Sequence, residues 1–289
     1  YIVINKNRFH QLINNQSYLK NFFNENASFE LFYSYGIPIY QKYARVNWLH
    51  VSNILPFMKD KFPLTLQEKL KIEILKNTFN STLKNPDIIS AESHASLDQI
   101  NSKNLFLSEN GSDEEIYFFK NRQTATFRRK NTAIIVGTYK YKALNDAYKI
   151  FQKLQLENSN LKLIIIGNKS PIPKALTNDS SVILAGLLSR DEVAEHLISS
   201  KFYLSATLVE NSYNAASEGV FLSQTSIISD ILPHRELLKY CNVKEYILPE
   251  SKRVFLKVQN TDLKISNIKS WDQVISELVS KLQEVLRLN

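Results

Sequence analysis

The second half of the chain alternates short apolar segments with amphipathic ones. Two intervening segments, residues 144–155 and 189–200, repeat apolar side chains at helical spacing. The apolar segments are rich in β-branched residues and almost continuously hydrophobic, as strands buried on both faces are. They span residues 132–137, 161–167, 181–186, 201–206 and 225–230. This alternation predicts a doubly wound α/β domain with a parallel sheet.

Local signals mark where several of these elements begin and end. Ser189, followed three residues later by Glu192, forms a capping box that predicts a helix start. Gly137, Gly167 and Gly186 each end a predicted strand, where the backbone must turn sharply. These glycines therefore lie at the carboxyl edge of the predicted sheet, which is the edge where such sheets bind ligands.

The first 120 residues show a weaker version of the same alternation. Residues 67–83 are the clearest helix there, and residues 270–288 at the other end of the chain form a capped amphipathic helix. The polar, charged stretch 109–131 is the predicted interdomain linker. The candidate strands span residues 1–5, 29–35, 46–52, 87–91 and 104–108.

Composition and charge narrow the class of protein. A chain of 289 residues with 44% hydrophobic content is larger than a usual domain with a single core, so we expect one large or two medium domains. No segment approaches the roughly 20 apolar residues of a spanning helix. The single cysteine, Cys241, fits a reducing compartment, so we expect a cytoplasmic protein. The net charge of +8 permits phosphorylated ligands or peripheral association with an anionic membrane at its inner face. Nucleic-acid motifs are absent, so we expect no nucleic-acid partner.

Two glutamates frame a predicted helix start in the second domain. Glu210 follows a strand, and Glu218 comes after seven intervening residues. Asn211 or Ser212 is the expected cap of this helix. The free amides of residues 212–214, which are Ser212, Tyr213 and Asn214, would then point outward as an anion site. Glu218 can accept two ribose hydroxyl groups, and Glu210 can reach a sugar hydroxyl.

The second half as a whole resembles the retaining GT-B glycosyltransferases of the GT4 type. Those enzymes share five ordered blocks, which read here IIVGTYKYK, LIIIG, VILAGLLS, ENSYNAASE and IISDILPHRE. The resemblance implies an α/β GT-B fold, with two Rossmann-like domains facing a cleft and a C-terminal helix crossing back to the first domain. It divides the chain into an acceptor-side domain, 1–122, lacking its first elements, a nucleotide-sugar-binding domain, 123–268, and a terminal helix, 269–289.

The resemblance also implies roles for individual residues. Glu218 holds the ribose, and Glu210 orients the sugar as a catalytic residue. Lys142, with Lys140 as a helper beside Gly137, holds the diphosphate, together with the amides of Asn211, Ser212, Tyr213 and Asn214. The backbone near Gly186 and Leu187 meets the base, and His50 is the catalytic candidate of the first domain. Thr138 departs from the family pattern, because an arginine usually stands there.

The expected function is therefore transfer of a sugar from a nucleotide sugar to a glycan or lipid-linked acceptor, as a hexosyltransferase that retains configuration and requires no metal or other cofactor. A catalytically weak or inactive GT-B partner protein and a sugar-nucleotide epimerase on the same scaffold are the alternatives. Each candidate residue also has a structural interpretation. The two glutamates would then be solvated acids at a helix start, His50 a core histidine, and Lys140 and Lys142 surface lysines. For His234 and Glu236, a structural role and a donor contact are both open.

Overall fold

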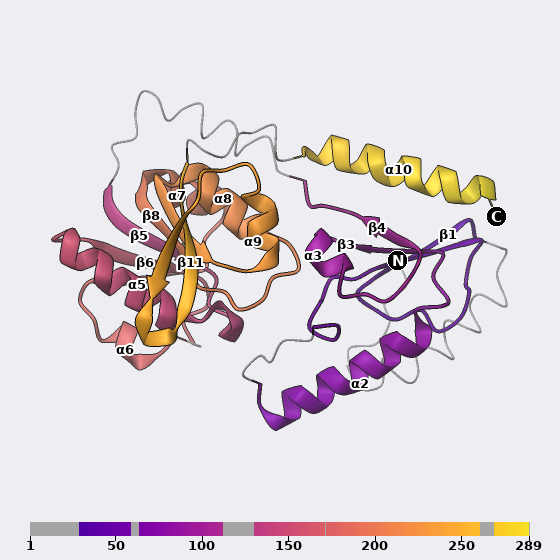
Figure 1. Cartoon of the computed structure of the whole chain (residues 1–289), viewed down its shortest axis with the longest axis horizontal. Helices are drawn as coiled ribbons and strands as arrows, with labels where there is room; N and C mark the ends of the chain where they lie inside the picture. Colours follow the sequence, from indigo (N-terminus) through magenta and orange to yellow (C-terminus); the bar gives the residue numbers. More distant parts are fainter. Residues whose placement is uncertain (1–28, 59–63, 112–129, 171, 261–268, 289) are drawn as a thin grey trace. The chain divides into compact units, whose positions relative to one another are not determined.

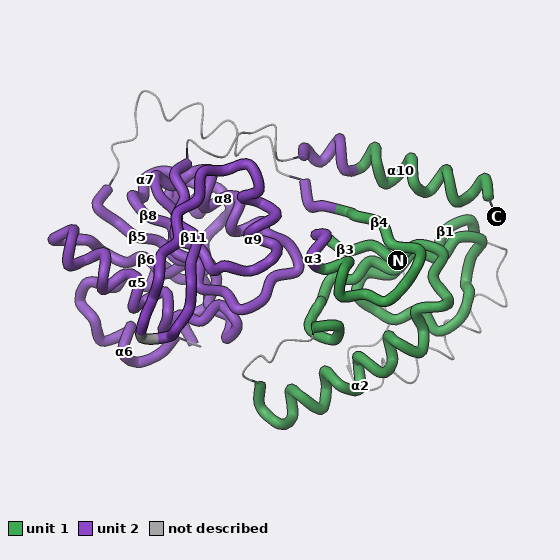
Figure 2. Tube along the Cα trace, viewed as in Figure 1, with its two compact units in different colours: residues 1–92, 96–108, 275–289 green, residues 93–95, 109–274 purple. Residues whose placement is uncertain are grey.

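The computed structural model describes residues 29–58, 64–111, 130–170, 172–260 and 269–288, which form two compact units (Figure 2). Unit 1 comprises Tyr1–Glu92, Ser96–Ser108 and Ile275–Asn289, and unit 2 comprises Ser93–Ala95 and Glu109–Val274. The expected strand at 1–5, the domain boundary at 122/123 and most of the predicted linker lie outside the described residues.

Unit 1 contains a parallel sheet of four strands in the order β1-β2-β3-β4. The strands β1 (Leu31–Tyr35), β2 (Val46–His50), β3 (Ile88–Ala91) and β4 (Leu105–Leu107) match four of the predicted strands to within two residues at either end. Helix α2 (Leu66–Thr82) begins at a capping box formed by Thr65 and Glu68. The single-turn helix α3 (His94–Leu97) follows β3.

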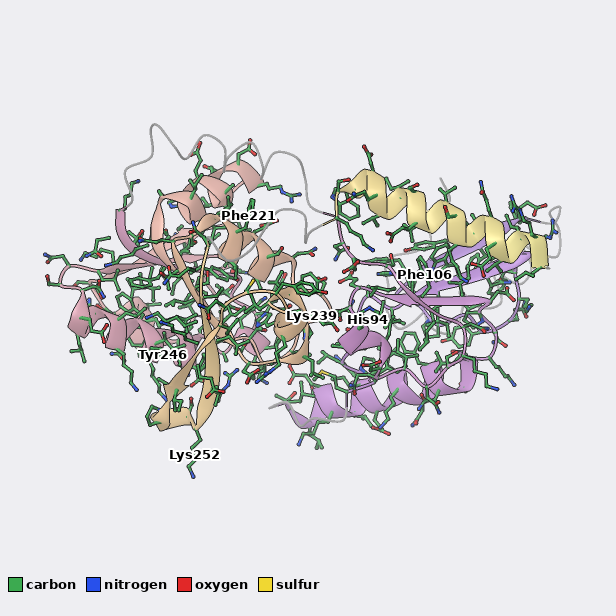
Figure 3. All side chains as sticks on the ribbon, turned by 45° about the horizontal axis from the view of Figure 1, so that its top comes forward. His94, Phe106, Phe221, Lys239, Tyr246 and Lys252 are labelled. Carbon is green, nitrogen blue, oxygen red and sulfur yellow. The ribbon has the colours of Figure 1, made fainter. Side chains whose placement is uncertain are left out.

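Two helices lie on opposite faces of the unit 1 sheet (Figure 1). Helix α10 (Trp271–Leu288) packs the apolar side chains of Leu278, Leu282, Val285 and Leu286 against Val46, Trp48 and Ile88. Phe106 of β4, labelled in Figure 3, meets the ring of Trp48 edge-on at 5.8 Å. The amphipathic stripe of α10 thus covers the face of the sheet that carries Trp48.

Unit 2 contains a sheet of seven strands in the order β10-β11-β9-β8-β5-β6-β7. Its five parallel strands are those predicted from the apolar segments: β5 (Lys130–Val136), β6 (Lys162–Ile166), β7 (Val182–Gly186), β8 (Ser200–Ser205) and β9 (Thr225–Ser229). Their continuous apolar character follows from burial on both faces.

Helices cover both faces of this sheet, each over its own core. One face packs against α7 (Arg190–Ser199), α8 (Asn214–Leu222) and α9 (Leu232–Leu237). The opposite face packs against α5 (Leu144–Glu157) and α6 (Lys174–Thr177). The expected capping box of Ser189 and Glu192 starts α7. This arrangement is the doubly wound architecture that the sequence predicts.

A β-hairpin at one edge of the sheet was not predicted. Strands β10 (Lys244–Leu248) and β11 (Arg253–Gln259) pair antiparallel with each other, and β11 pairs antiparallel with β9. The short 3₁₀ turn η2 (Pro249–Ser251) joins them. Their charged and polar residues hide the strand pattern because β10 has only one neighbouring strand. No described helix is long and apolar enough to cross a membrane.

Gly219 is required for the close packing of α8 on β8. A Cβ atom added at this position would lie 2.3 Å from Cδ1 of the buried Tyr203. We expect Gly219→Ala to lower the free energy of unfolding by about 1–3 kcal/mol through overpacking. Urea unfolding measures this change. The control Glu195→Ala, on the exposed face of α7, should change it by no more than about 0.5 kcal/mol. Equal stability of both variants would contradict the packing argument.

Candidate functional site

The unit 2 sheet has a topological switch point between β5 and β8. From β5 the chain passes to β6 and β7 on one side, and it then returns to β8 and β9 on the other. The loops that leave the carboxyl ends of β5 and β8 therefore diverge and leave a crevice, where ligands of doubly wound sheets bind. Lys142 follows β5, and Glu210 follows β8.

Lys142 lies across Gly137, the first residue after β5. Gly137 has φ +90°, and a Cβ atom there would lie 3.2 Å from Cε of Lys142. The left-handed backbone and the missing side chain thus let the lysine lie against the main chain. Lys142 ends the 3₁₀ turn η1 (Lys140–Lys142), and the Leu208 amide donates to the Tyr141 carbonyl of this turn at 2.7 Å. The last bond ties the loop after β8 to the loop after β5.

Lys142 and Glu210 form an ion pair between Nζ and Oε1. Their side chains are only 11% and 19% exposed, so each charge needs the other for compensation. The neighbouring Tyr141 has its pKa raised to about 12, first by burial and then by the negative charge of Glu210. The two residues expected to hold diphosphate and sugar are thus brought together within unit 2.

Thr138 supplies no positive charge at the carboxyl edge of the unit 2 sheet. Its side chain is buried, and its Cγ2 lies 2.9 Å from where a Cβ of Gly167 would be. Thr138 therefore fills space between the ends of β5 and β6, at the position where the resembled family carries arginine. Lys140 lies beside it in η1 with its side chain exposed. Lysines alone thus supply the positive charge of this loop.

Glu218 pairs with Arg190, a residue that the sequence analysis did not single out. Arg190 Nη2 lies 3.2 Å from Glu218 Oε1, and the arginine side chain is 52% exposed. Arg190 is the first residue of α7, directly after the loop that carries Gly186 and the exposed Leu187. The expected base-binding backbone and the expected ribose acid are therefore linked through one arginine. The Ser189 cap could have indicated that Arg190 begins a helix, but not which residue it meets.

The start of α8 differs from the prediction. The helix begins at Asn214, and Tyr213 is its N-cap without a side-chain hydrogen bond. Asn211 and Ser212 are therefore not caps of this helix, because the chain turns into it only after them. The Tyr213 hydroxyl instead donates to Glu109 at 2.9 Å. Asn214 is the first residue of α8, so of the three amides expected to face an anion, those of Ser212 and Tyr213 precede the helix.

His234 is fully buried and electrically neutral. Its Nδ1 lies 2.7 Å from the Ser229 carbonyl, which only accepts, so the ring proton is on Nδ1. Burial lowers the pKa of His234 to about 4, and the positive charge of Lys142 contributes to this lowering. Glu236 accepts hydrogen bonds from the amides of His94 and Ala95, which cluster with unit 2. These contacts give both residues structural roles.

His50 lies in unit 1, at the carboxyl end of β2. The side chain is buried, and its Nδ1 and Nε2 approach Ser90 at 3.0 Å and Glu92 at 3.5 Å. The sequence analysis did not single out Glu92, which follows β3. Among the described residues, no group of three or more histidine, cysteine, aspartate or glutamate side chains is arranged to hold a metal ion. That no metal is needed stays a prediction.

The Lys142–Glu210 pair should show strong energetic coupling. We expect Lys142→Met and Glu210→Gln each to destabilise unit 2, because each leaves the other charge poorly compensated. The double variant should recover about 1–3 kcal/mol of the summed loss. Urea unfolding of the four proteins measures this. The exposed helical pair of Lys281 and Glu284 is the matched control, with an expected coupling of about 0.5 kcal/mol or less. Additive losses at Lys142 and Glu210 would contradict the pairing.

His234 should make stability depend on pH. Its folded pKa of about 4 lies below the ordinary 6.5, so the unfolded chain binds the proton more readily. Stability is therefore complete above pH 6.5 and falls as the pH drops toward 4, by about 1.4 kcal/mol per unit between these values. In His234→Asn, the amide keeps a donor for Ser229 without titrating. Urea midpoints from pH 7 to 5 should thus fall less in the variant, and parallel curves would contradict the assignment.

No family model matches the chain, and no curated protein matches it either. Several solved structures are similar in fold. A UDP-forming α,α-trehalose-phosphate synthase from Burkholderia xenovorans matches with a TM-score of 0.52 and 11% identity, over 81% of this chain and 67% of its own. A trehalose-6-phosphate structure from E. coli bound with UDP-2-fluoro glucose matches with a TM-score of 0.51 and 9% identity, over 82% and 67%. AviGT4, a glycosyltransferase involved in avilamycin A biosynthesis, matches with 0.51 and 11%, over 69% and 64%.

This chain thus spans 64% to 67% of the length of those three proteins. At identities of 9% to 11% the similarity concerns the fold. Each unit described above is an α/β layer structure around a sheet that is parallel throughout in unit 1 and over five of its seven strands in unit 2. The fold class expected from the sequence is confirmed: this chain has the GT-B fold.

Proposed function

We propose that this protein is a glycosyltransferase that moves a sugar from a nucleotide-sugar donor to a glycan or lipid-linked acceptor in bacterial surface polysaccharide or glycoconjugate synthesis. The observation that carries the proposal is the Lys142–Glu210 pair at the switch point of the unit 2 sheet. A cation and a carboxylate held together at that point suit a ligand that carries both phosphate and sugar.

The diphosphate of the donor would bind Lys142. As the bond between sugar and diphosphate breaks, negative charge develops on the leaving group, and a fixed cation stabilises that charge. Lys140, two residues earlier in the same turn η1, adds a second positive charge. In the free protein, Glu210 compensates the charge of Lys142. A phosphate that binds Lys142 would supply part of this compensation, so phosphate binding would help to release the Glu210 carboxylate from the lysine.

Glu210 would then act on the sugar. Its carboxylate stabilises the positive charge that develops at the anomeric carbon, and it orients the ring by accepting a hydrogen bond from a sugar hydroxyl. Glu218 would accept the ribose hydroxyls, for which the hydrogen bond from Arg190 holds one carboxylate oxygen in place. The backbone at Gly186 and Leu187 would meet the base. Retention of configuration follows from the family resemblance alone and is part of the proposal.

The alternative is a GT-B protein without catalytic activity. Thr138 favours it, because a buried threonine supplies none of the charge that an arginine would give the diphosphate. Arg190 does not replace that charge, since its guanidinium group already pairs with Glu218. We also infer that the protein acts in the cytoplasm, with peripheral attachment to anionic lipid supported by its net charge of +8.

Turnover of donors decides between the two functions. We expect the protein to bind UDP in a calorimeter and to release nucleoside diphosphate from at least one of UDP-glucose, UDP-galactose, UDP-N-acetylglucosamine and GDP-mannose. Glu210→Gln should slow this release about 10²-fold or more without weakening UDP binding, because the charge acts in the transition state and Lys142 no longer has to give up a carboxylate partner. The control Glu195→Gln should keep the parental rate. UDP binding without any turnover would favour the inactive protein, and no nucleotide binding would refute both.

A further inference from the structure

A chain of hydrogen bonds runs along one face of the unit 1 sheet, between β2 and β3, and ends at a buried carboxylate. The indole Nε1 of Trp48 donates to Ser90 Oγ at 2.8 Å, and this hydroxyl lies 3.0 Å from His50 Nδ1. His50 Nε2 then faces Glu92 Oε1 at 3.5 Å. A carboxylate only accepts, so Nε2 carries the proton, and in the neutral ring Nδ1 accepts from Ser90. The chain fixes both the ring of His50 and the direction of its proton.

Glu92 has more hydrogen-bonding capacity than this chain uses. The residue is only 8% exposed, and the contact with His50 is long for a hydrogen bond. Within the described part of the chain, His50 is the one hydrogen-bonding partner of this carboxylate, which can accept about four bonds. A buried carboxylate with so little compensation calls for a further donor, and none of the described residues provides one.

An exposed aromatic surface adjoins this carboxylate. In the strand register Tyr35 lies opposite His50 and Tyr33 opposite Trp48, so all four side chains share one face. Tyr35 stacks on His50 with ring centroids 5.1 Å apart and planes at 9°, yet it is 61% exposed. Tyr33 is 49% exposed. One face of Tyr35 is thus fixed by the protein, and the ring offers a flat apolar surface to solvent.

The backbone holds Tyr35 in this position. Gly36 follows it with φ +72°, and the Gly36 amide donates to the His50 carbonyl at 2.7 Å. A Cβ atom at Gly36 would lie 2.3 Å from Ser52 Oγ, so only glycine fits this turn. Burial raises the pKa of Tyr33 and Tyr35, and the charge of Glu92 adds to this effect, for Tyr33 after that of Tyr35.

We propose that Tyr35, Tyr33 and Glu92 form a binding site for an uncharged sugar. The apolar C–H face of a pyranose would lie on Tyr35, and two neighbouring hydroxyls would donate to Glu92, whose orientation His50 fixes. This site rests on the proposed function, for which it names the acceptor as a neutral sugar. A phosphorylated sugar would be repelled by the carboxylate. A simple ammonium ion would be attracted by the carboxylate but has no apolar C–H face to lie on Tyr35, so the exposed ring favours a sugar.

Saturation-transfer NMR on the full chain tests this site. The probes are the methyl glycosides of glucose, galactose, mannose and N-acetylglucosamine, with glucose 6-phosphate and putrescine as charged contrasts. We expect at least one neutral glycoside to bind through its ring C–H protons, and glucose 6-phosphate and putrescine to bind more weakly. Tyr35→Ala and Glu92→Gln should weaken binding about tenfold or more, whereas Tyr35→Phe keeps the ring and should bind as the parent does.

The matched control is Tyr139→Ala, which removes an exposed, stacked tyrosine from unit 2. It should leave glycoside binding unchanged. Binding of no neutral glycoside, binding that survives both Tyr35→Ala and Glu92→Gln, or tighter binding of either charged probe would overturn the site. UDP calorimetry on the same samples separates this failure from that of the proposed function. Parental UDP affinity without sugar binding refutes the unit 1 site alone, whereas loss of UDP binding in the parent refutes the donor assignment.

Discussion

The ion pair of Lys142 and Glu210 is the interaction on which the unit 2 site depends. Neither charge can be buried at 11% and 19% exposure without compensation, so the loops after β5 and β8 must come together for the fold to be stable. Gly137 makes the approach possible on one side, and the bond from the Leu208 amide to the Tyr141 carbonyl closes it on the other. The switch point of the sheet is thereby occupied by two opposite charges before any ligand binds.

The same pair adds to the effect of burial on the pKa of two neighbouring groups. The carboxylate makes ionisation of Tyr141 harder, and the ammonium group makes protonation of His234 harder. Both neighbours therefore stay neutral near pH 7, and the pair is the local source of charge that a ligand can redistribute. Arg253 helps to hold the loop that leads to Glu210. It donates hydrogen bonds to the carbonyls of Ala206 and Thr207 in that loop and to the carboxylate of Asp146.

Sequence patterns predict the parts of this structure that depend on local signals. The continuous apolar segments correspond to β5 to β9 because burial on both faces selects such residues, and Ser189 with Glu192 starts α7 because a capping box is complete within one turn. The hairpin of β10 and β11 is missed because an edge carries charged residues. Arg190 and Glu92 are missed because their partners, Glu218 and His50, lie 28 and 42 residues away in sequence. Spacing along the chain contains no signal for such contacts.

The two units differ in the charge that they offer at the carboxyl ends of their strands. In unit 2, Lys140, Lys142 and Arg190 lie at the edge where a diphosphate would bind. Glu210 and Glu218 compensate Lys142 and Arg190 in the free protein, so these three cations stand against two carboxylates. In unit 1, the corresponding edge carries Glu92 beside two exposed tyrosines, and His50 already directs its proton toward that carboxylate. An anionic ligand is thus favoured by the first edge and disfavoured by the second. The proposed transfer needs two substrates that do not exchange their places, and this difference in charge would give each of them one favourable edge.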